Sequence, residues 1–181
     1  TPSGDNFMLY NGSQMLARDG NFDAYPDFGL YLSRFSNQWG FLLMLTALFR
    51  LLGALGVTHF FFPLVVLQAA WYVLGTRSAL RIARKLEGAR GEIMAMLLMA
   101  VCLPLVLAAS VLYTDTFSLP FILMALDLAL CARDAESAKG QIGYACLCGV
   151  ITLLGCQIKM TVLIALIAAI GVWLMTMKPV R

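Results

Sequence analysis

Charged residues are scarce in this sequence, and their scarcity excludes several classes of protein. Asp, Glu, Lys and Arg make up 13% of the 181 residues, whereas a typical soluble protein has about 25%. Hydrophobic residues make up 61%, and the mean hydropathy is +0.83. A soluble enzyme, a disordered chain or a DNA-binding domain of this size could not accommodate so much apolar surface. The composition therefore predicts an all-α, polytopic integral membrane protein.

Metal-binding and disulfide motifs are also lacking. The chain has one histidine, and its five cysteines all lie in apolar runs without a CxxC pair. Because a zinc site needs ligands at short spacings, we expect the cysteines to be small buried residues and not ligands or disulfides. The basic segment 77–92 has no interleaved aromatic residues, which argues against a nucleic-acid partner. Since residues 1–37 are polar, no cleavable signal peptide is expected.

The chain divides into a polar N-terminal region and a series of apolar segments. In the polar region the pattern predicts a helix over residues 5–18 and a loop over residues 19–38. Downstream, runs of about 17–25 apolar residues fit a hydrocarbon core of about 30 Å. They predict about five transmembrane helices, at residues 59–76, 93–112, 117–132, 142–158 and 160–177.

Basic residues set the expected topology, because cytoplasmic loops carry an excess of Lys and Arg. Most of the basic residues lie in segment 77–92, in segment 133–139 and at the C-terminus. Along the predicted helices these places alternate with segment 113–116 and with Lys159. We therefore expect the basic places, including a solvated face at 77–92, to lie in the cytoplasm and the other two to lie outside.

Segment 41–57 allows two interpretations. As a transmembrane helix it would place Arg50 in the hydrocarbon, at a cost of about 2.5–3.5 kcal/mol. As an interfacial helix it would lie flat, with its apolar face in the lipid and a polar stripe that includes Thr46 and Arg50. We favour the flat helix, which gives an external region over residues 1–57 and a transmembrane domain over residues 58–181.

Several short motifs occur in an order that is typical of one family of membrane enzymes. They are Ser3-Gly4-Asp5, Ala24-Tyr25-Pro26, residues 31–40, residues 113–120 and residues 157–164. Together they resemble the GT-C glycosyltransferases of the family 39 type, which include protein O-mannosyltransferases and aminoarabinose transferases. The resemblance covers nearly the whole chain. It departs from the family pattern at Gly4, where an acid is common, and at Met160, where a proline is common.

The resemblance implies a function and a location. The implied reaction is the inverting transfer of a sugar from polyprenyl phosphate to an acceptor hydroxyl, on the extracytoplasmic face of a bacterial plasma membrane. The implied partners are the lipid-linked sugar donor, membrane lipids, and N- and C-terminal helices of the same protein, of which this chain would be an internal piece. Alone, such a piece is expected to be inactive.

The resemblance also implies roles for four residues. Asp5 is the implied general base. Asp115 is implied either to bind a divalent metal, Mg²⁺ or Mn²⁺, or to position the leaving phosphate. Lys159 and Arg34 are the implied contacts of the donor phosphate.

The residues themselves leave other roles open. Asp5 and Asp115 can each cap a helix, and Lys159 can be a snorkelling anchor at the membrane interface. Asp127 is expected to lie near headgroups or to bond a neighbouring helix, and not to be catalytic. Two alternative functions are a transporter with Asp127 and Lys159 along its path and a non-catalytic membrane scaffold.

Overall fold

The computed structural model describes residues 5–22, 26–103, 107 and 113–176, and the regular elements in that part of the chain are all helical. The prediction of an all-α fold is therefore confirmed. Helices α6 and α7 are each long and apolar enough to cross a bilayer. The elements in chain order are α1 (Asp5–Arg18), α2 (Pro26–Arg34), the 3-10 turn η1 (Ser36–Gln38), α3 (Trp39–Ala54), α4 (Phe61–Val101), α6 (Thr114–Asp134), α7 (Ala138–Ile158) and α8 (Val162–Thr176).

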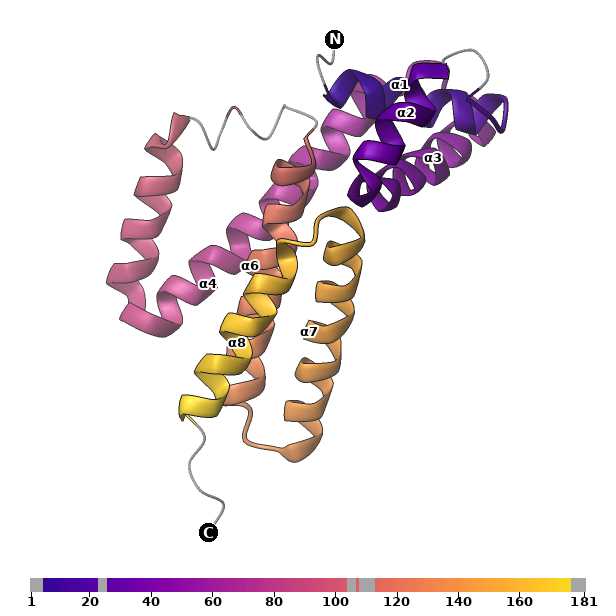
Figure 1. Ribbon diagram of the computed structural model, residues 1–181. Coiled ribbons are helices and arrows are strands. Elements are labelled where there is room, and N and C mark those ends of the chain that lie inside the picture. Colours follow the sequence, from indigo (N-terminus) through magenta and orange to yellow (C-terminus); the bar gives the residue numbers. More distant parts are fainter. Residues whose placement is uncertain (1–4, 23–25, 104–106, 108–112, 177–181) are drawn as a thin grey trace.

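The helices form a bundle with a helical cluster at one end (Figure 1). Helices α4, α6, α7 and α8 make up the bundle, and α1, α2 and α3 gather at the end where α4 and α6 begin and α7 leads into α8. The opposite end holds a bend within α4, the connection from α6 to α7 and the end of α8. We call these the cluster end and the bend end.

An apolar core joins the helical cluster to the bundle. Its buried side chains come from α1, α2 and α3, from the start of α4 and α6, and from both sides of the turn between α7 and α8: Leu9, Phe28, Leu32, Phe41, Leu42, Leu45, Phe49, Phe60, Leu64, Phe117, Phe121, Ile158 and Val162. At Gly40 an added Cβ would lie 1.6 Å from the backbone oxygen of Gln157. The start of α3 therefore contacts the end of α7 directly, which fixes the cluster on the bundle.

Helix α4 corrects the prediction of a solvated basic loop at residues 77–92. The helix continues through most of this segment and bends at Gly88, where φ is 69° and ψ is −157°. Ala, Leu, Arg, Lys and Glu make up most of residues 79–87 and are strong helix formers, so their charge does not end the helix. The bend falls at a glycine because only glycine adopts this conformation readily.

Helices α4 and α6 pack side by side and run in the same direction. Near the cluster end, the Trp71 indole donates a hydrogen bond to the Phe117 carbonyl at 3.2 Å. Further along, a Cβ on Gly75 would lie 2.9 Å from the Cα of Pro120, so the two backbones approach closely there. This register places Arg81 and Lys85 beside the second half of α6, where they contact Asp127 and Asp134.

The predicted loop over residues 19–38 was wrong in its second half. Residues 26–34 form α2, in which Phe28 and Leu32 are both 2% exposed. These two side chains lie one helical turn apart, and a Cβ on Gly12 would lie 2.1 Å from the Phe28 ring. The short helix is therefore held by its contact with α1. The predicted helix over residues 5–18 has the bounds of α1.

Helix α3 corrects the interpretation of its polar stripe. Thr46 is 5% exposed and donates to the Leu42 carbonyl at 2.8 Å. Arg50 donates to the carbonyl of Leu16 in α1 at 3.1 Å. The stripe is therefore divided: Thr46 is buried, whereas Arg50 is exposed and reaches α1 with its guanidinium group. Large apolar residues are exposed on the remaining surface of α3, namely Trp39, Leu43 and Leu51. An interfacial helix needs such a face, but the orientation of α3 in a membrane stays a prediction.

The five cysteines are free thiols, and the expectation that all are buried was wrong. Cys131 and Cys148 are buried and Cys156 is half-buried, whereas Cys102 and Cys146 are exposed. An apolar run predicts a helix but does not tell which face of the helix packs inward, so the exposure of each thiol could not be predicted.

Candidate functional site

Two of the predicted site residues, Asp115 and Lys159, meet at the cluster end. Lys159 Nζ donates a hydrogen bond to Asp115 Oδ1, and the two side chains form an ion pair. The Asp115 side chain is 51% exposed and the Lys159 side chain 23%. Lys159 Nζ also lies 5.9 Å from the centroid of the Tyr113 ring, within the range of a cation–π interaction. The site is thus an ion pair that solvent or a headgroup can reach.

The first turn of α6 positions Asp115 through contacts of its neighbours. The Thr116 hydroxyl donates to the Tyr113 carbonyl at 2.7 Å, and the Ser118 hydroxyl donates to the Asp115 carbonyl at 2.9 Å. Gln68 of α4 donates to Thr116 Oγ1 at 3.2 Å. The residue in the N-cap position is Tyr113, so the structure gives Asp115 no capping role. A carboxylate in the first turn of a helix is also favoured by the helix dipole.

The turn between α7 and α8 positions Lys159. Its backbone is extended, with φ −154°, and its N–H donates to the Gly155 carbonyl at 2.9 Å. A Cβ on Gly155 would lie 2.8 Å from Phe121 Cβ and 2.8 Å from Val162 Cγ1. Because Gly155 lets α7 approach α6 this closely, the lysine after it reaches the first turn of α6.

The structure describes the side chain of only one of the other two predicted site residues. Arg34 is the last residue of α2, is exposed, and makes no ion pair with any residue that the structure describes. Asp5 begins α1 at the backbone level, but its side chain lies outside the described part of the chain, as do Ser3-Gly4 and Ala24-Tyr25. The roles of Asp5 and Arg34 stay predictions.

The residues around Asp115 do not fit the implied divalent metal. Mg²⁺ and Mn²⁺ favour several oxygen ligands, whereas the Asp115 carboxylate is engaged by an ammonium group. Within the described ranges no three residues of the His, Cys, Asp or Glu type come together to hold a metal ion.

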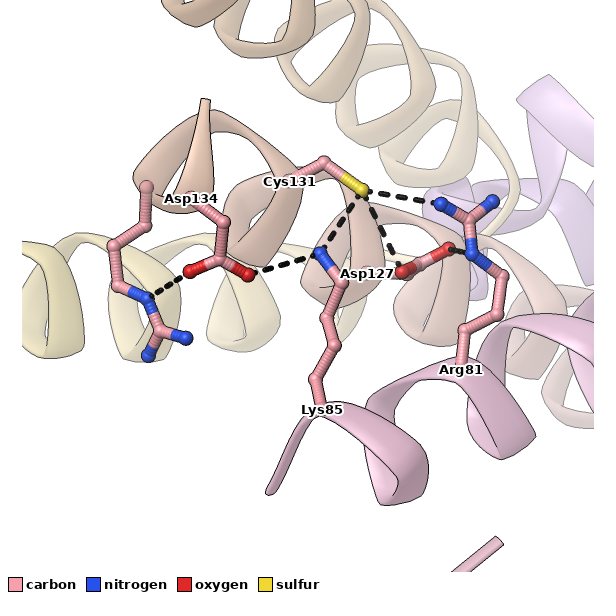
Figure 2. A network of polar contacts seen from close by, with 6 residues as sticks. Arg81, Lys85, Asp127, Cys131 and Asp134 are labelled. Carbon is pink, nitrogen blue, oxygen red and sulfur yellow. Dashed lines mark hydrogen bonds and ion pairs between the residues drawn. The ribbon is translucent and has the colours of Figure 1, made fainter. Parts of the chain in front are cut away.

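A second polar cluster, nearer the bend end, links α4 to α6 (Figure 2). Asp127 is 3% exposed, and its Oδ2 lies 3.3 Å from Arg81 Nε. The Cys131 thiol lies 3.2 Å from both Arg81 Nη2 and Lys85 Nζ. Lys85 Nζ also lies 3.2 Å from Asp134 Oδ2. We call these five residues the inter-helix network.

The inter-helix network corrects the prediction that Arg81 and Lys85 belong to a solvated face, because both contact side chains of α6. Burial alone lowers the pKa of Lys85, but its contacts with Cys131 and Asp134 outweigh burial and raise the pKa above its usual value. A spacing signal was present, since Asp127, Cys131 and Asp134 lie at i, i+4 and i+7 on one face of α6. The expectation that Asp127 bonds a neighbouring helix is confirmed.

Comparisons of the chain with family models, with curated proteins and with solved structures gave no match. The observations that bear on function are therefore the Asp115–Lys159 ion pair, the inter-helix network and the order of the sequence motifs.

Proposed function

We propose that this chain belongs to an integral membrane glycosyltransferase of the GT-C type, which transfers a sugar from polyprenyl phosphate to an acceptor hydroxyl. The observation that carries the proposal is the pairing of Asp115 with Lys159. The two residues come from separate motifs of the resemblance and meet at the end of the bundle that carries α1, α2 and α3 (Figure 1). An exposed ion pair contributes at most about 1 kcal/mol to stability. Stability alone therefore does not account for the Asp115–Lys159 pair at the cluster end.

The length and surface of the bundle support a membrane location. Helices α6 and α7 have 21 residues each, which corresponds to about 31 Å and matches a hydrocarbon core of about 30 Å. Many large apolar side chains on α7 and α8 are exposed, among them Ile142, Leu153 and Ile164. Arg84 and Arg90 lie next to the bend, so the positive-inside rule puts the bend end in the cytoplasm and the cluster end outside.

The proposed reaction is a displacement at the anomeric carbon of the sugar. The acceptor oxygen forms a bond to this carbon, and the bond from the carbon to the phosphate oxygen breaks. Negative charge develops on the departing polyprenyl phosphate, and the Lys159 ammonium offsets it. Asp115 holds Lys159 in position, and the resemblance assigns the proton of the acceptor hydroxyl to Asp5. The polyprenyl tail stays in the bilayer next to the cluster end.

The test is sugar transfer by membranes that contain the protein, measured with radiolabelled polyprenyl-phosphate sugars. We expect Asp115→Asn and Lys159→Gln each to lower transfer at least about 10²-fold, with little change in the temperature of unfolding. The matched control is Asp19→Asn, because Asp19 is an exposed aspartate at the end of α1, and its transfer should be unchanged. Normal transfer by both site variants would contradict the proposed role of the ion pair.

The buried Asp127 favours a second candidate function, the transport of an ion across the membrane. A carboxylate that is 3% exposed within a candidate membrane span is costly and is often functional in transporters. Proton flux into proteoliposomes tests this candidate. Flux that is lost in Asp127→Asn and kept in Asp115→Asn would favour transport over glycosyl transfer.

A further inference from the structure

A cavity lies between α4, α6 and α7, away from the cluster-end site. Its volume is about 270 Å³. The polar part of its wall is formed by Arg77, Ser78, Arg81 and Asp127. The apolar part includes Met124, Leu128 and Leu147. Such a division suits an amphiphile with one charged end and one apolar chain.

The polar part of the cavity carries a net positive charge. Arg81 and Asp127 form an ion pair and offset one another. Arg77 lies one helical turn before Arg81, is exposed, and pairs with no acid among the residues that the structure describes. Ser78, at 8% exposure, adds a hydroxyl next to it. The cavity therefore offers a guanidinium group and a hydroxyl group to an anion.

The depth of Arg77 in the bundle makes an anionic partner favourable if α6 crosses a bilayer. Arg77 lies between two contacts of α4 with α6, that of Gly75 with Pro120 and that of Arg81 with Asp127. It is thus beside the middle of α6 and not at its end. A charged side chain at this depth is expensive, and the bilayer responds by thinning so that polar groups reach it.

We propose that this cavity binds an anionic phospholipid of the cytoplasmic leaflet. The lipid phosphate contacts Arg77 and Ser78, and the first part of an acyl chain lies along Met124, Leu128 and Leu147. Basic pockets between membrane helices on this side are suited to anionic headgroups. The inference rests on the membrane location given in the proposed function and is independent of glycosyl transfer.

The test is lipid retention by the whole chain after reconstitution into vesicles of phosphatidylcholine with and without phosphatidylglycerol, followed by native mass spectrometry of the extracted protein. We expect one phosphatidylglycerol to be retained in preference to phosphatidylcholine. Arg77→Gln should lower this retention about fivefold, and Arg77→Lys should largely restore it. Leu147→Trp, which fills the cavity from α7, should lower it as well. The matched control is Arg90→Gln, which removes an exposed charge outside the cavity and should leave retention unchanged.

The outcomes separate the inference from the function on which it rests. Equal retention of the two lipids, or equal retention by Arg77→Gln and Arg90→Gln, would overturn the lipid site. Displacement of the lipid by millimolar glycerol phosphate alone would also overturn it, since a soluble phosphate would then be the ligand. Failure of the chain to insert into any vesicle would overturn the membrane location together with the site, whereas loss of sugar transfer alone would leave the site standing.

Discussion

The two ends of the bundle are stabilised by different kinds of contact. At the cluster end, packed apolar side chains from seven helices form the core, and the ion pair of Asp115 and Lys159 is partly exposed. Toward the bend end, α4 and α6 are linked by a network in which the acid Asp127 is buried and Arg81 reaches it from α4 (Figure 2). The charges at the cluster end are therefore dispensable for folding, whereas those of the inter-helix network are part of the fold.

This difference indicates which charges are available for chemistry. A buried ion pair cannot lose one partner without leaving an uncompensated charge, so its removal costs about 3–5 kcal/mol. An exposed pair contributes at most about 1 kcal/mol, and either partner can turn to a substrate without unfolding the protein. The sequence predicts different roles for Asp115 and Asp127, and the structure adds that the Asp127 side chain is buried whereas that of Asp115 is exposed.

The contact between α3 and α7 gives the largest expected effect on stability. In Gly40→Ala the new Cβ would overlap the Gln157 carbonyl, which forces the cluster away from the bundle and costs about 3 kcal/mol. Gly29→Ala is the control, because a Cβ there meets nothing within 4 Å, and it should be neutral or slightly stabilising. Thermal unfolding in detergent measures both variants. An equal effect of the two would show that α3 does not rest on α7.

Breaking the inter-helix network is expected to cause the second largest loss of stability. Arg81→Gln leaves the Asp127 carboxylate buried without its main cation, and we expect a loss of about 2 kcal/mol. This value is below the 3–5 kcal/mol of a fully buried pair, because the Arg81 side chain is 47% exposed.

The control for this variant is Arg84→Gln on the same helix. Arg84 pairs with Glu92 at 3.4 Å, and its side chain is 68% exposed, so its removal should cost less than about 0.5 kcal/mol. Chemical unfolding in detergent compares the two. If Arg84→Gln were as destabilising as Arg81→Gln, the distinction between a structural network and a solvated face would not hold.

A substitution at the bend in α4 is expected to cause a smaller loss of stability. Gly88 has a positive φ of 69°, so Gly88→Ala should cost about 1.5 kcal/mol from backbone strain alone. Gly143→Ala in α7 has similar open space around it but helical geometry, and we expect it to be neutral or stabilising. A stable Gly88→Ala variant, judged by its temperature of unfolding, would argue that α4 does not bend at this residue.

Removing the Lys85 ammonium group is expected to cause the smallest loss of stability. The sign of its pH dependence follows from the direction of the Lys85 pKa shift. Since the pKa of Lys85 is raised above its usual value of 10.5, its stabilising contribution is present below that value and is lost as the pH rises through the higher folded-state pKa. Lys85→Met should lower stability by less than about 1 kcal/mol at pH 8, and the difference from wild type should shrink as the pH rises through the folded-state pKa of Lys85. The control is Lys139→Met, at an exposed lysine outside the network, which should change stability less at pH 8 when both variants are compared in unfolding scans.

Helices with strong local signals could be predicted from the sequence. The bounds of α1 agree with the expected helix over residues 5–18, and the long apolar runs at 117–132 and 142–158 fall within α6 and α7. Helix α2 was missed because its signal, Phe28 and Leu32 one turn apart, depends on contact with α1. The start of α4 agrees with the predicted helix at 59–76, but its continuation to the bend at Gly88 differs from the prediction. The charged residues there suggest a loop, although most of them favour a helix.

The site could be predicted only in part. The distribution of basic residues placed Asp115 and Lys159 on one side, and the structure brings them into contact across 44 residues of sequence. That contact depends on how closely Gly155 lets α7 approach Phe121, which no local pattern encodes. The inter-helix network likewise depends on the register of α4 against α6, since a shift of one residue would turn Arg81 away from Asp127.

In the proposed topology, the cluster end and the bend end face opposite sides of a membrane. Labelling of single cysteines in intact cells tests it most directly, with Asp19→Cys in the cluster and Glu87→Cys at the bend, each in a background in which the five native cysteines are replaced by alanine or serine. Both positions are exposed, so both react once a reagent reaches them. We predict that a membrane-impermeant maleimide labels position 19 in intact cells and labels position 87 only after the membrane is permeabilised. Labelling of both positions from the same side would contradict the claim.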